Sequence, residues 1–261
     1  MIELIERRVF GAIEFIDDLS ETRVLSPLQI HAPGVQVLRN RSGFYVLREV
    51  DGQDAYTRAV DNPPARPARS ELMLNVQDPA QRYLPQRIGL ALPRWLTDGA
   101  ETVDDADNAL KPVVVRLTPA AGMPLQSAWA VLRLKVAITG SATGLANVLV
   151  EAQPALPGLP LRRSFTDRHG EALVVIVSAP PFLPLAGPPA GLTREFPVVL
   201  TLVMDRSVVR PSTDTEFPSP DPALILQRRT DGHADVRVVA TGEQLFSAGT
   251  RRRRTDLVTW P

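Results

Sequence analysis

The hydrophobic positions of this chain fall into short runs of strand length, separated by Gly, Pro, Asp and Asn residues. The clearest runs lie in the middle of the chain and are rich in Val, Leu and Ile. They are Trp129–Ile138, Leu145–Val150, Phe165–Val177 and Phe196–Met204. Apolar runs of this length with turn residues between them are typical of a small antiparallel sandwich. Residues 128–205 are therefore predicted to form one β-sandwich.

Residues 1–96 repeat this pattern and are predicted to form another β-sandwich. Their runs show partial alternation of apolar and polar residues, as expected of strands with one buried face. The predicted strands are Arg8–Asp17, Val24–Ile30, Val35–Arg39, Phe44–Leu47, Glu71–Val76 and Arg87–Leu92. Pro27 favours an edge position or a bulge for the second of them, because proline has no N–H for the ladder.

Residues 97–127 are predicted to be an acidic linker plus one strand. Residues 97–111 are polar and acidic, and the strand Pro112–Leu117 follows them. The pattern leaves open whether this strand closes the first sandwich or opens the second.

The last segment, residues 206–261, is predicted to be an extended connector and a C-terminal β-hairpin. The hairpin strands are Ala223–Arg228 and Ala234–Ala240, with a turn around Asp231 and Gly232. A hairpin of this size is marginal alone, so we expect it to dock on a domain or on a partner.

Composition supports the β assignment. The 25 Pro and 16 Gly among 261 residues interrupt the chain too often for long helices, and no apolar window keeps a period of 3.6 residues. The predicted fold class is all-β, with two small antiparallel β-sandwich domains, Pro-rich loops and a C-terminal β-hairpin.

Charge and cysteine content narrow the partners and the compartment. Lys plus Arg and Asp plus Glu both total 29, so no overall field attracts nucleic acid or an anionic membrane. The chain has no cysteine, which suits a reducing compartment. The N-terminus is too charged for a signal peptide, and no run approaches the roughly 18–20 apolar residues of a membrane span. We expect a cytoplasmic protein without nucleic-acid partners or direct membrane insertion.

The residues that usually carry catalysis or metal binding show no organised spacing. His31, His169 and His233 lie in or beside predicted turns and share no short spacing. The acidic residues of Asp104–Asp107 lack the Gly and the terminal Glu of a calcium loop. The sequence has no Gly-x-Ser-x-Gly elbow and no phosphate-binding Gly-rich loop. We therefore expect no enzyme, no metal and no cofactor.

Two Asp–His pairs are the basis of an enzymatic alternative. Asp167 stands two residues before His169, and Asp231 two residues before His233. Asp and Gly are the residues that tight turns require, so both pairs are interpreted as turn chemistry.

Two Pro-rich stretches, residues 153–160 and 179–189, carry large apolar side chains. Phe182, Leu183 and Leu185 in the second stretch are candidate partner contacts, because large apolar side chains are unfavourable in a loop that faces only solvent. The alternative is that the stretch folds back over its own sandwich.

The C-terminus supplies the other candidate contacts, which are Arg251, Arg252, Arg253, Arg254 and Trp260. The arginine run has two interpretations: a solvated strand, or an ion-pairing strip for an acidic protein partner.

The central pattern resembles a known module. Gly144–Val150, then Phe165–Gly170 and an apolar strand, resemble the carboxypeptidase regulatory-like (transthyretin-like) β-sandwich over residues 128–205. Thr166, Asp167 and Gly170 match the Thr-Asp-x-x-Gly turn that leads a core strand in that family. Such modules are mostly structural or adhesive. The enzymatic branch uses histidines and a C-terminal Tyr-Arg-Gly-Ser motif that this chain lacks, so its activity is not implied.

The first sandwich gives a second resemblance. Ala32–Gly43 and Arg82–Pro93 are similar to hypothetical proteins encoded in phage-tail-like contractile injection system clusters. The resulting hypothesis is a non-enzymatic structural subunit of such a particle, associated with its cap or baseplate. Its partners would be other protein subunits of the particle, including copies of itself. The alternative is a free β-sandwich binding module that recognises carbohydrate or protein through its Pro-rich loops.

Overall fold

The computed structural model confirms that the protein is all-β. It describes residues 9–53, 70–92, 111–125, 129–155, 157–176, 193–247, 250–251 and 254–260. Strands are the main regular structure of these residues, and they are arranged in several sheets. The chain divides into two compact units. The first comprises Met1–Pro79 and Pro85–Leu117, and the second comprises Ala80–Leu84 and Thr118–Pro261.

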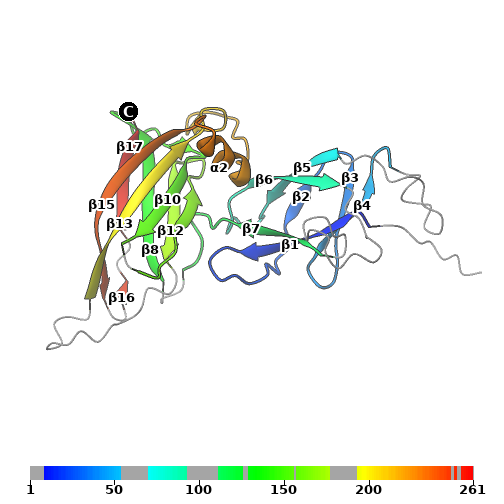
Figure 1. Ribbon diagram of the computed structural model, residues 1–261, viewed down its shortest axis with the longest axis horizontal. Helices are drawn as coiled ribbons and strands as arrows, with labels where there is room; N and C mark the ends of the chain where they lie inside the picture. Colours follow the sequence, from blue (N-terminus) through cyan, green and yellow to red (C-terminus); the bar gives the residue numbers. More distant parts are fainter. Residues whose placement is uncertain are drawn as a thin grey trace, which may run out of the picture. The chain divides into compact units, whose positions relative to one another are not determined.

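Two sheets make up the first unit (Figure 1). One has the order β3-β4-β1-β7, and the other has the order β2-β5-β6. Their bounds are β1 Gly11–Asp17, β2 Gln29–His31, β3 Val35–Arg39, β4 Tyr45–Val50, β5 Ser70–Gln77, β6 Gln86–Leu92 and β7 Val113–Leu117.

Buried and half-buried side chains alternate along β1, and the buried ones belong to the core of the first unit. Ile13 and Phe15 are buried, and the residues between them are only half-buried. The ring of Phe15 packs edge-on against Tyr45 of β4 with centroids 5.2 Å apart. Tyr45 Oη also accepts a hydrogen bond from the N–H of Leu28 at 2.6 Å, which satisfies a buried backbone donor.

The position of β7 answers the question that the sequence left open. β7 lies parallel to β1, with Ile13 beside Val113 and Asp17 beside Leu117. The buried side chain of Gln86 on β6 donates a hydrogen bond to the carbonyl of Arg116 at 3.1 Å. Strand 113–117 therefore closes the first sandwich.

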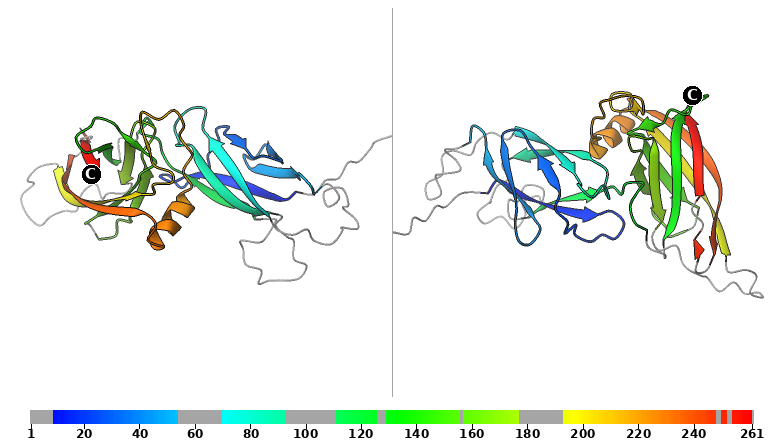
Figure 2. Two further views of the ribbon diagram at one scale, coloured as in Figure 1. Left: turned by 90° about the horizontal axis from the view of Figure 1, so that it is seen from above. Right: turned by 180° about the vertical axis from the view of Figure 1, so that it is seen from behind.

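The second unit also packs two main sheets, with orders β11-β10-β13-β15-β16 and β12-β8-β17, and a small pair β14-β9. Their bounds are β8 Ala130–Ile138, β9 Leu145–Ala146, β10 Leu149–Pro154, β11 Arg162–Phe165, β12 Glu171–Ile176, β13 Thr193–Met204, β14 Arg210–Pro211, β15 Asp235–Ser247, β16 Thr250–Arg251 and β17 Arg254–Trp260. The right view of Figure 2 shows red β17 beside green β8, its parallel partner.

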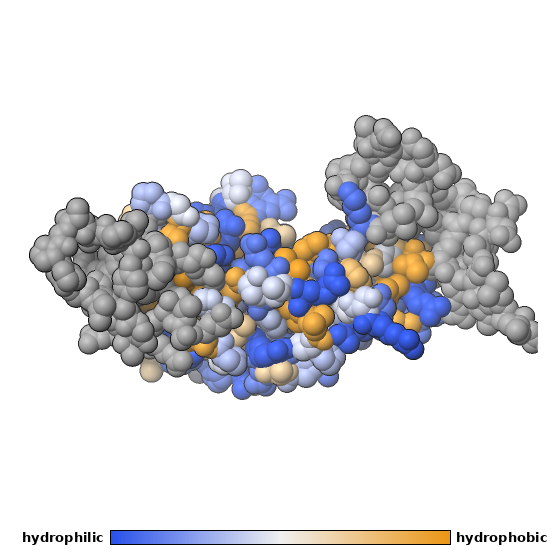
Figure 3. Space-filling model, turned by 90° about the horizontal axis from the view of Figure 1, so that it is seen from below, coloured by the Kyte–Doolittle hydropathy of each residue, from blue (hydrophilic) through white to orange (hydrophobic). Residues whose placement is uncertain are grey.

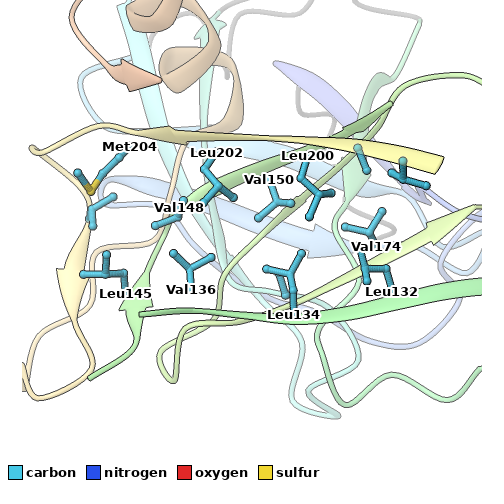
Figure 4. Packing of buried hydrophobic residues seen from close by; sticks show 14 of the residues in the cluster. Leu132, Leu134, Val136, Leu145, Val148, Val150, Val174, Leu200, Leu202 and Met204 are labelled. Atoms are coloured by element: carbon cyan, nitrogen blue, oxygen red, sulfur yellow. The ribbon is translucent and has the colours of Figure 1, made fainter. Parts of the chain in front are cut away.

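The core of the second unit lies between these two sheets. Figure 4 shows Leu200 and Leu202 of β13 facing Leu134 and Val136 of β8 across the interior. All four side chains are at most 2% exposed. Burial of a Val or Leu side chain contributes about 1.5–3 kcal/mol, so this cluster contributes strongly to the stability of the unit.

The C-terminal segment belongs to this same core. β15 pairs antiparallel with β13 from Asp235 to Ser247, and β17 pairs with β8 from Arg254 to Trp260. β15 and β17 lie within the predicted connector and hairpin of residues 206–261, which we expected to dock on a domain or on a partner. These two strands complete the second sandwich of their own chain.

The prediction of a strand at Ala223–Arg228 is wrong, because these residues lie in a helix, α2 (Pro222–Thr230). Asp221 caps the helix, since its carboxylate accepts hydrogen bonds from the N–H groups of Ala223 and Leu224. Pro222 occupies the first turn, where a missing N–H is harmless. A short apolar run does not distinguish a strand from a helix, and the capping signal was the better guide.

α2 covers part of the outer face of the β10–β13 sheet (Figures 1 and 2). Its buried residue Ile225 packs with Leu149, Phe165 and Val203. α2 has nine residues, and the described part of the chain contains no helix with the length and apolar character of a membrane span.

Candidate protein-interaction edge

The structure places three of the predicted contact residues. Arg251 is the last residue of β16, Arg254 is the first of β17, and Trp260 ends β17 beside Ile138 of β8. Three Cα steps join Arg251 to Arg254, so their Cα atoms lie within about 11 Å of each other. These arginines therefore mark the place where the chain crosses from one sheet to the other. Phe182, Leu183, Leu185, Arg252 and Arg253 lie outside the described residues.

The outermost long strand at this side of the unit is β15. One side of β15 pairs with β13 along its whole length. Among the described residues, its other side pairs only with β16, at Phe246 and Ser247. Among the described residues, the stretch Asp235–Leu245 therefore has no strand partner on this side, and such an edge is a template for another strand.

A bulge divides this edge. Pro197 of β13 is opposite Glu243, but Val199 is opposite Ala240, so β15 carries one extra residue between these pairs. Pro197 has no N–H to donate to the ladder, and bulges are the usual place for such a residue. The regular part of the open edge is consequently Asp235–Ala240.

Three exposed valines, which we call the valine strip, lie on the outer face next to the open edge. They are Val199 (41% exposed), Val236 (49%) and Val238 (66%). Directly opposite residues of paired strands share a face, and Val236 is opposite Val203 while Val238 is opposite Thr201. Val203 is buried under α2, but the helix leaves the strip uncovered. Orange and blue patches alternate on the face of the described residues that Figure 3 shows, so exposed apolar groups are scattered there among polar ones.

Two buried carboxylates hold α2 in place beside this edge through interactions with its arginines. Glu151 accepts hydrogen bonds from Arg163 Nε at 3.0 Å and from Arg229 of α2. Asp205 forms an ion pair with Arg228 of α2, with Oδ2 and Nε 2.7 Å apart. Both carboxylates are almost fully buried, so each requires its cationic partner. They fix the end of the helix from which the chain enters β15.

The Thr166–Gly170 turn is structural, as the sequence predicted. Thr166 Oγ1 donates to the carbonyl of Leu145 at 2.6 Å and accepts from the N–H of Val148 at 2.9 Å. One oxygen of Asp167 accepts from the N–H groups of His169 and Glu171. The turn leads into β12, where residues 172–176 are buried.

The three histidines lie in separate elements and turns of the described ranges. His169 is exposed, and its Nε2 accepts a hydrogen bond from Arg168 Nε at 3.0 Å. His31 is exposed in β2, and His233 lies in the turn after α2, where its N–H donates to the carbonyl of Arg228. Within the described residues, no group of three or more His, Asp or Glu residues is placed to hold a metal ion.

The open edge and the valine strip were not anticipated from the sequence. Ala234–Ala240 was correctly predicted as strand, but a pattern does not show which strand is outermost. The exposure of Val236 and Val238 depends on where α2 lies, and the sequence prediction had no helix there.

Comparison of the chain with protein-family models, with curated proteins and with solved structures gave no match.

Proposed function

We propose that this protein is a non-enzymatic structural subunit of a protein assembly, which joins its neighbour by accepting a strand at the open edge of β15. The observation that carries the proposal is the edge Asp235–Leu245, which has no strand partner beyond β16 within the described part of the chain. Strand addition provides main-chain hydrogen bonds for affinity, and alternate side chains provide specificity. The exposed Val238 beside the edge is the kind of side chain that such a neighbour covers.

The assembly we favour is a phage-tail-like contractile injection particle, in which the chain is a cap- or baseplate-associated subunit formed in the cytoplasm. The likeness of Ala32–Gly43 and Arg82–Pro93 to proteins encoded in such clusters supports this choice. The turn that precedes the buried strand β12 supports the likeness of the second unit to transthyretin-like modules, which are mostly structural. The alternative, a free binding module, rests on Pro-rich residues 179–189, which lie outside the described part of the chain.

A photo-crosslinking residue at position 238 tests the edge. Val238 is 66% exposed, so p-benzoylphenylalanine fits there without disturbing the core. Leu25 of the first unit is 68% exposed and is the matched control position. In purified contractile particles we expect crosslinks from position 238 to one tube, sheath or baseplate subunit, and none to that subunit from position 25.

Mass spectrometry of the same particles tests the assembly. The chain should be present in fixed ratio to tube or sheath. Its absence from intact particles contradicts the proposed particle, and equal crosslinking from both positions contradicts the proposed edge.

A further inference from the structure

We infer that the strand which docks on β15 is β15 of a second copy of this chain, paired about a two-fold axis with Val238 opposite Val238 of that copy. This inference rests on the proposed function and identifies the neighbour. Three features lead to it: the residue types of the edge, the registers that two-fold symmetry allows, and the place that β16 occupies.

The regular part of the edge has the residue types of a paired strand. Asp235–Ala240 contains three valines in six residues and no Lys or Pro. Edge strands that stay unpaired are usually protected by lysine, by proline or by a bulge, and the bulge of β15 lies beyond Ala240. Val236 and Val238 are 49% and 66% exposed. This stretch is therefore suited to pairing with another strand.

Two-fold symmetry restricts the registers between two copies of β15. Antiparallel pairing of identical strands requires a two-fold axis perpendicular to the sheet, so the outer face of one copy continues into the outer face of the other. Residues directly opposite each other share a face, and neighbouring residues of a strand point to opposite faces. An axis that passes between two residues would set an outer-face residue opposite an inner-face one. One residue must therefore lie opposite its own counterpart.

The register centred on Val238 suits the valine strip. It places Val238 opposite its counterpart and Val236 opposite Ala240 of the second copy. These three positions share the outer face, because they lie opposite Thr201, Val203 and Val199 of β13. The exposed valines of the two copies then cover one another, and burial of each valine is favourable.

The other symmetric registers are less favourable. An axis at position 237 sets two arginines directly opposite each other, and like charges in that arrangement are destabilising. With the axis at Val238, position 237 lies opposite Val239 instead. An axis at Val236 sets Val238 opposite Ala234, which precedes β15, and an axis beyond Val238 brings the bulge into the ladder.

The register centred on Val238 also leaves room for β16. The docked strand begins at Asp235 of the second copy, which lies opposite position 241. Among the described residues, the same row contains β16 opposite Phe246 and Ser247. Positions 242–245 separate the docked strand from β16. The segment 231–234, which joins α2 to β15, spans the same number of residues.

The isolated pair should be a weak dimer. A short strand pair buries less surface than a standard protein interface of about 1,600 Å², so two free copies should separate on dilution. In a particle, other contacts hold the copies together and raise their effective concentration. A covalent trap is therefore the suitable test in solution.

Single cysteines test the register on the full-length protein, which has no cysteine of its own. Directly opposite Cβ atoms lie about 4.5–5.5 Å apart, close to the geometry of a disulfide. With oxidised glutathione we expect Val238→Cys to form a disulfide-linked dimer roughly tenfold faster than Val114→Cys, because the docked cysteines react at a high effective concentration. Val114 is the matched control, since it is a valine of β7 that is 54% exposed.

Two further cysteines distinguish this register from random collision. Val236→Cys should not crosslink to itself, because its two copies lie about 13 Å apart along the strands. Mixing the V236C protein with the Ala240→Cys protein should give a disulfide-linked heterodimer. Without cysteines, Val238→Lys should abolish the concentration-dependent association seen by sedimentation velocity, and Val114→Lys should leave it unchanged.

The outcomes separate this inference from the proposed function. Equal, slow dimer formation by V238C and V114C, together with a monomeric unmodified chain up to about 1 mM, overturns the second copy as partner. Self-crosslinking of V236C in place of V238C overturns the register. Crosslinks in particles from position 238 to a different subunit overturn the second copy and retain the proposed edge. Crosslinks from position 238 to no protein of the particle overturn both.

Discussion

Gly144 and Gly170 pack backbone against backbone where the loop after β8 passes the turn before β12. A Cβ atom on Gly170 would lie 2.7 Å from Cα of Gly144 and 2.6 Å from the carbonyl oxygen of Val136. Gly170 also has a φ of +80°, which L side chains rarely adopt. The sequence marked Gly170 as a turn residue. The structure adds that neither glycine has space for a side chain.

Alanine substitutions separate strain from steric conflict. Gly140→Ala is the control, because its φ is +76° and nothing lies within 4 Å of its Cβ position. It should cost about 1–2 kcal/mol of unfolding free energy, the usual cost of the left-handed region. Gly170→Ala should cost roughly 4 kcal/mol or more, because rigid backbone atoms must also move. Urea unfolding measures both. Equal costs would show that the close approach has no energetic weight.

At the scale of elements, α2 and its two anchoring carboxylates determine what the second sheet exposes. The helix buries Val203 through Ile225 and leaves Val236 and Val238 in solvent. Its C-terminal turn is fixed by Glu151 and Asp205, which are 5% and 1% exposed at the side chain. An acidic residue within a β-strand looks like a solvent-facing position in sequence. Here Glu151 is buried because α2 covers that face with Arg229.

A double-mutant cycle between Glu151 and Arg229 tests this anchor. Glu151→Gln should destabilise the protein by roughly 2–3 kcal/mol, because it leaves an arginine without its counter-charge. Arg229→Gln should cost a similar amount. The double variant should be more stable than the sum predicts, with a coupling energy of about 1–2 kcal/mol measured by chemical denaturation. Strict additivity would show that the two residues stabilise the protein independently.

At the scale of the whole molecule, the two units are not two consecutive stretches of sequence. Residues 80–84, between β5 and β6 of the first unit, belong to the second unit. The N–H of Leu84 donates to the carbonyl of Thr118, and its side chain packs with Leu149 and Ile225. The domain boundary near residue 96, predicted from composition, gives no indication that residues 80–84 belong to the second unit.

Leu84→Ala should therefore weaken the second unit rather than the first. Leu84 is 8% exposed, and loss of its side chain should cost about 2–3 kcal/mol. Hydrogen exchange measured by mass spectrometry should show faster exchange in β10 and β13 and unchanged exchange in β1 and β4. Leu74→Ala on β5, whose side chain is fully buried in the first unit, is the control and should show the reverse. Faster exchange throughout in both variants would mean that the units unfold together.

The local pattern was sufficient for the class of fold and for most strands. Alternation in β1, the turn residues before β12 and the apolar runs of β8 and β13 act between near neighbours in the chain, so the sequence reports them directly. It failed at Ala223–Arg228, where a run too short to show a period was helical. The cap residue Asp221 was the local signal that distinguished the two states.

The sequence by itself determined that this chain is an all-β protein with two sandwich units and a structural turn at Thr166–Gly170. Only the tertiary structure decided that β7 closes the first sandwich, that β17 lies parallel to β8, and that β15 has an open edge among the described residues. The physical reason is that strand order, exposure and pairing depend on contacts between residues far apart in the chain, such as Val203 with Ile225. The candidate site lies in this second category, because an edge exists only once the sheet has formed.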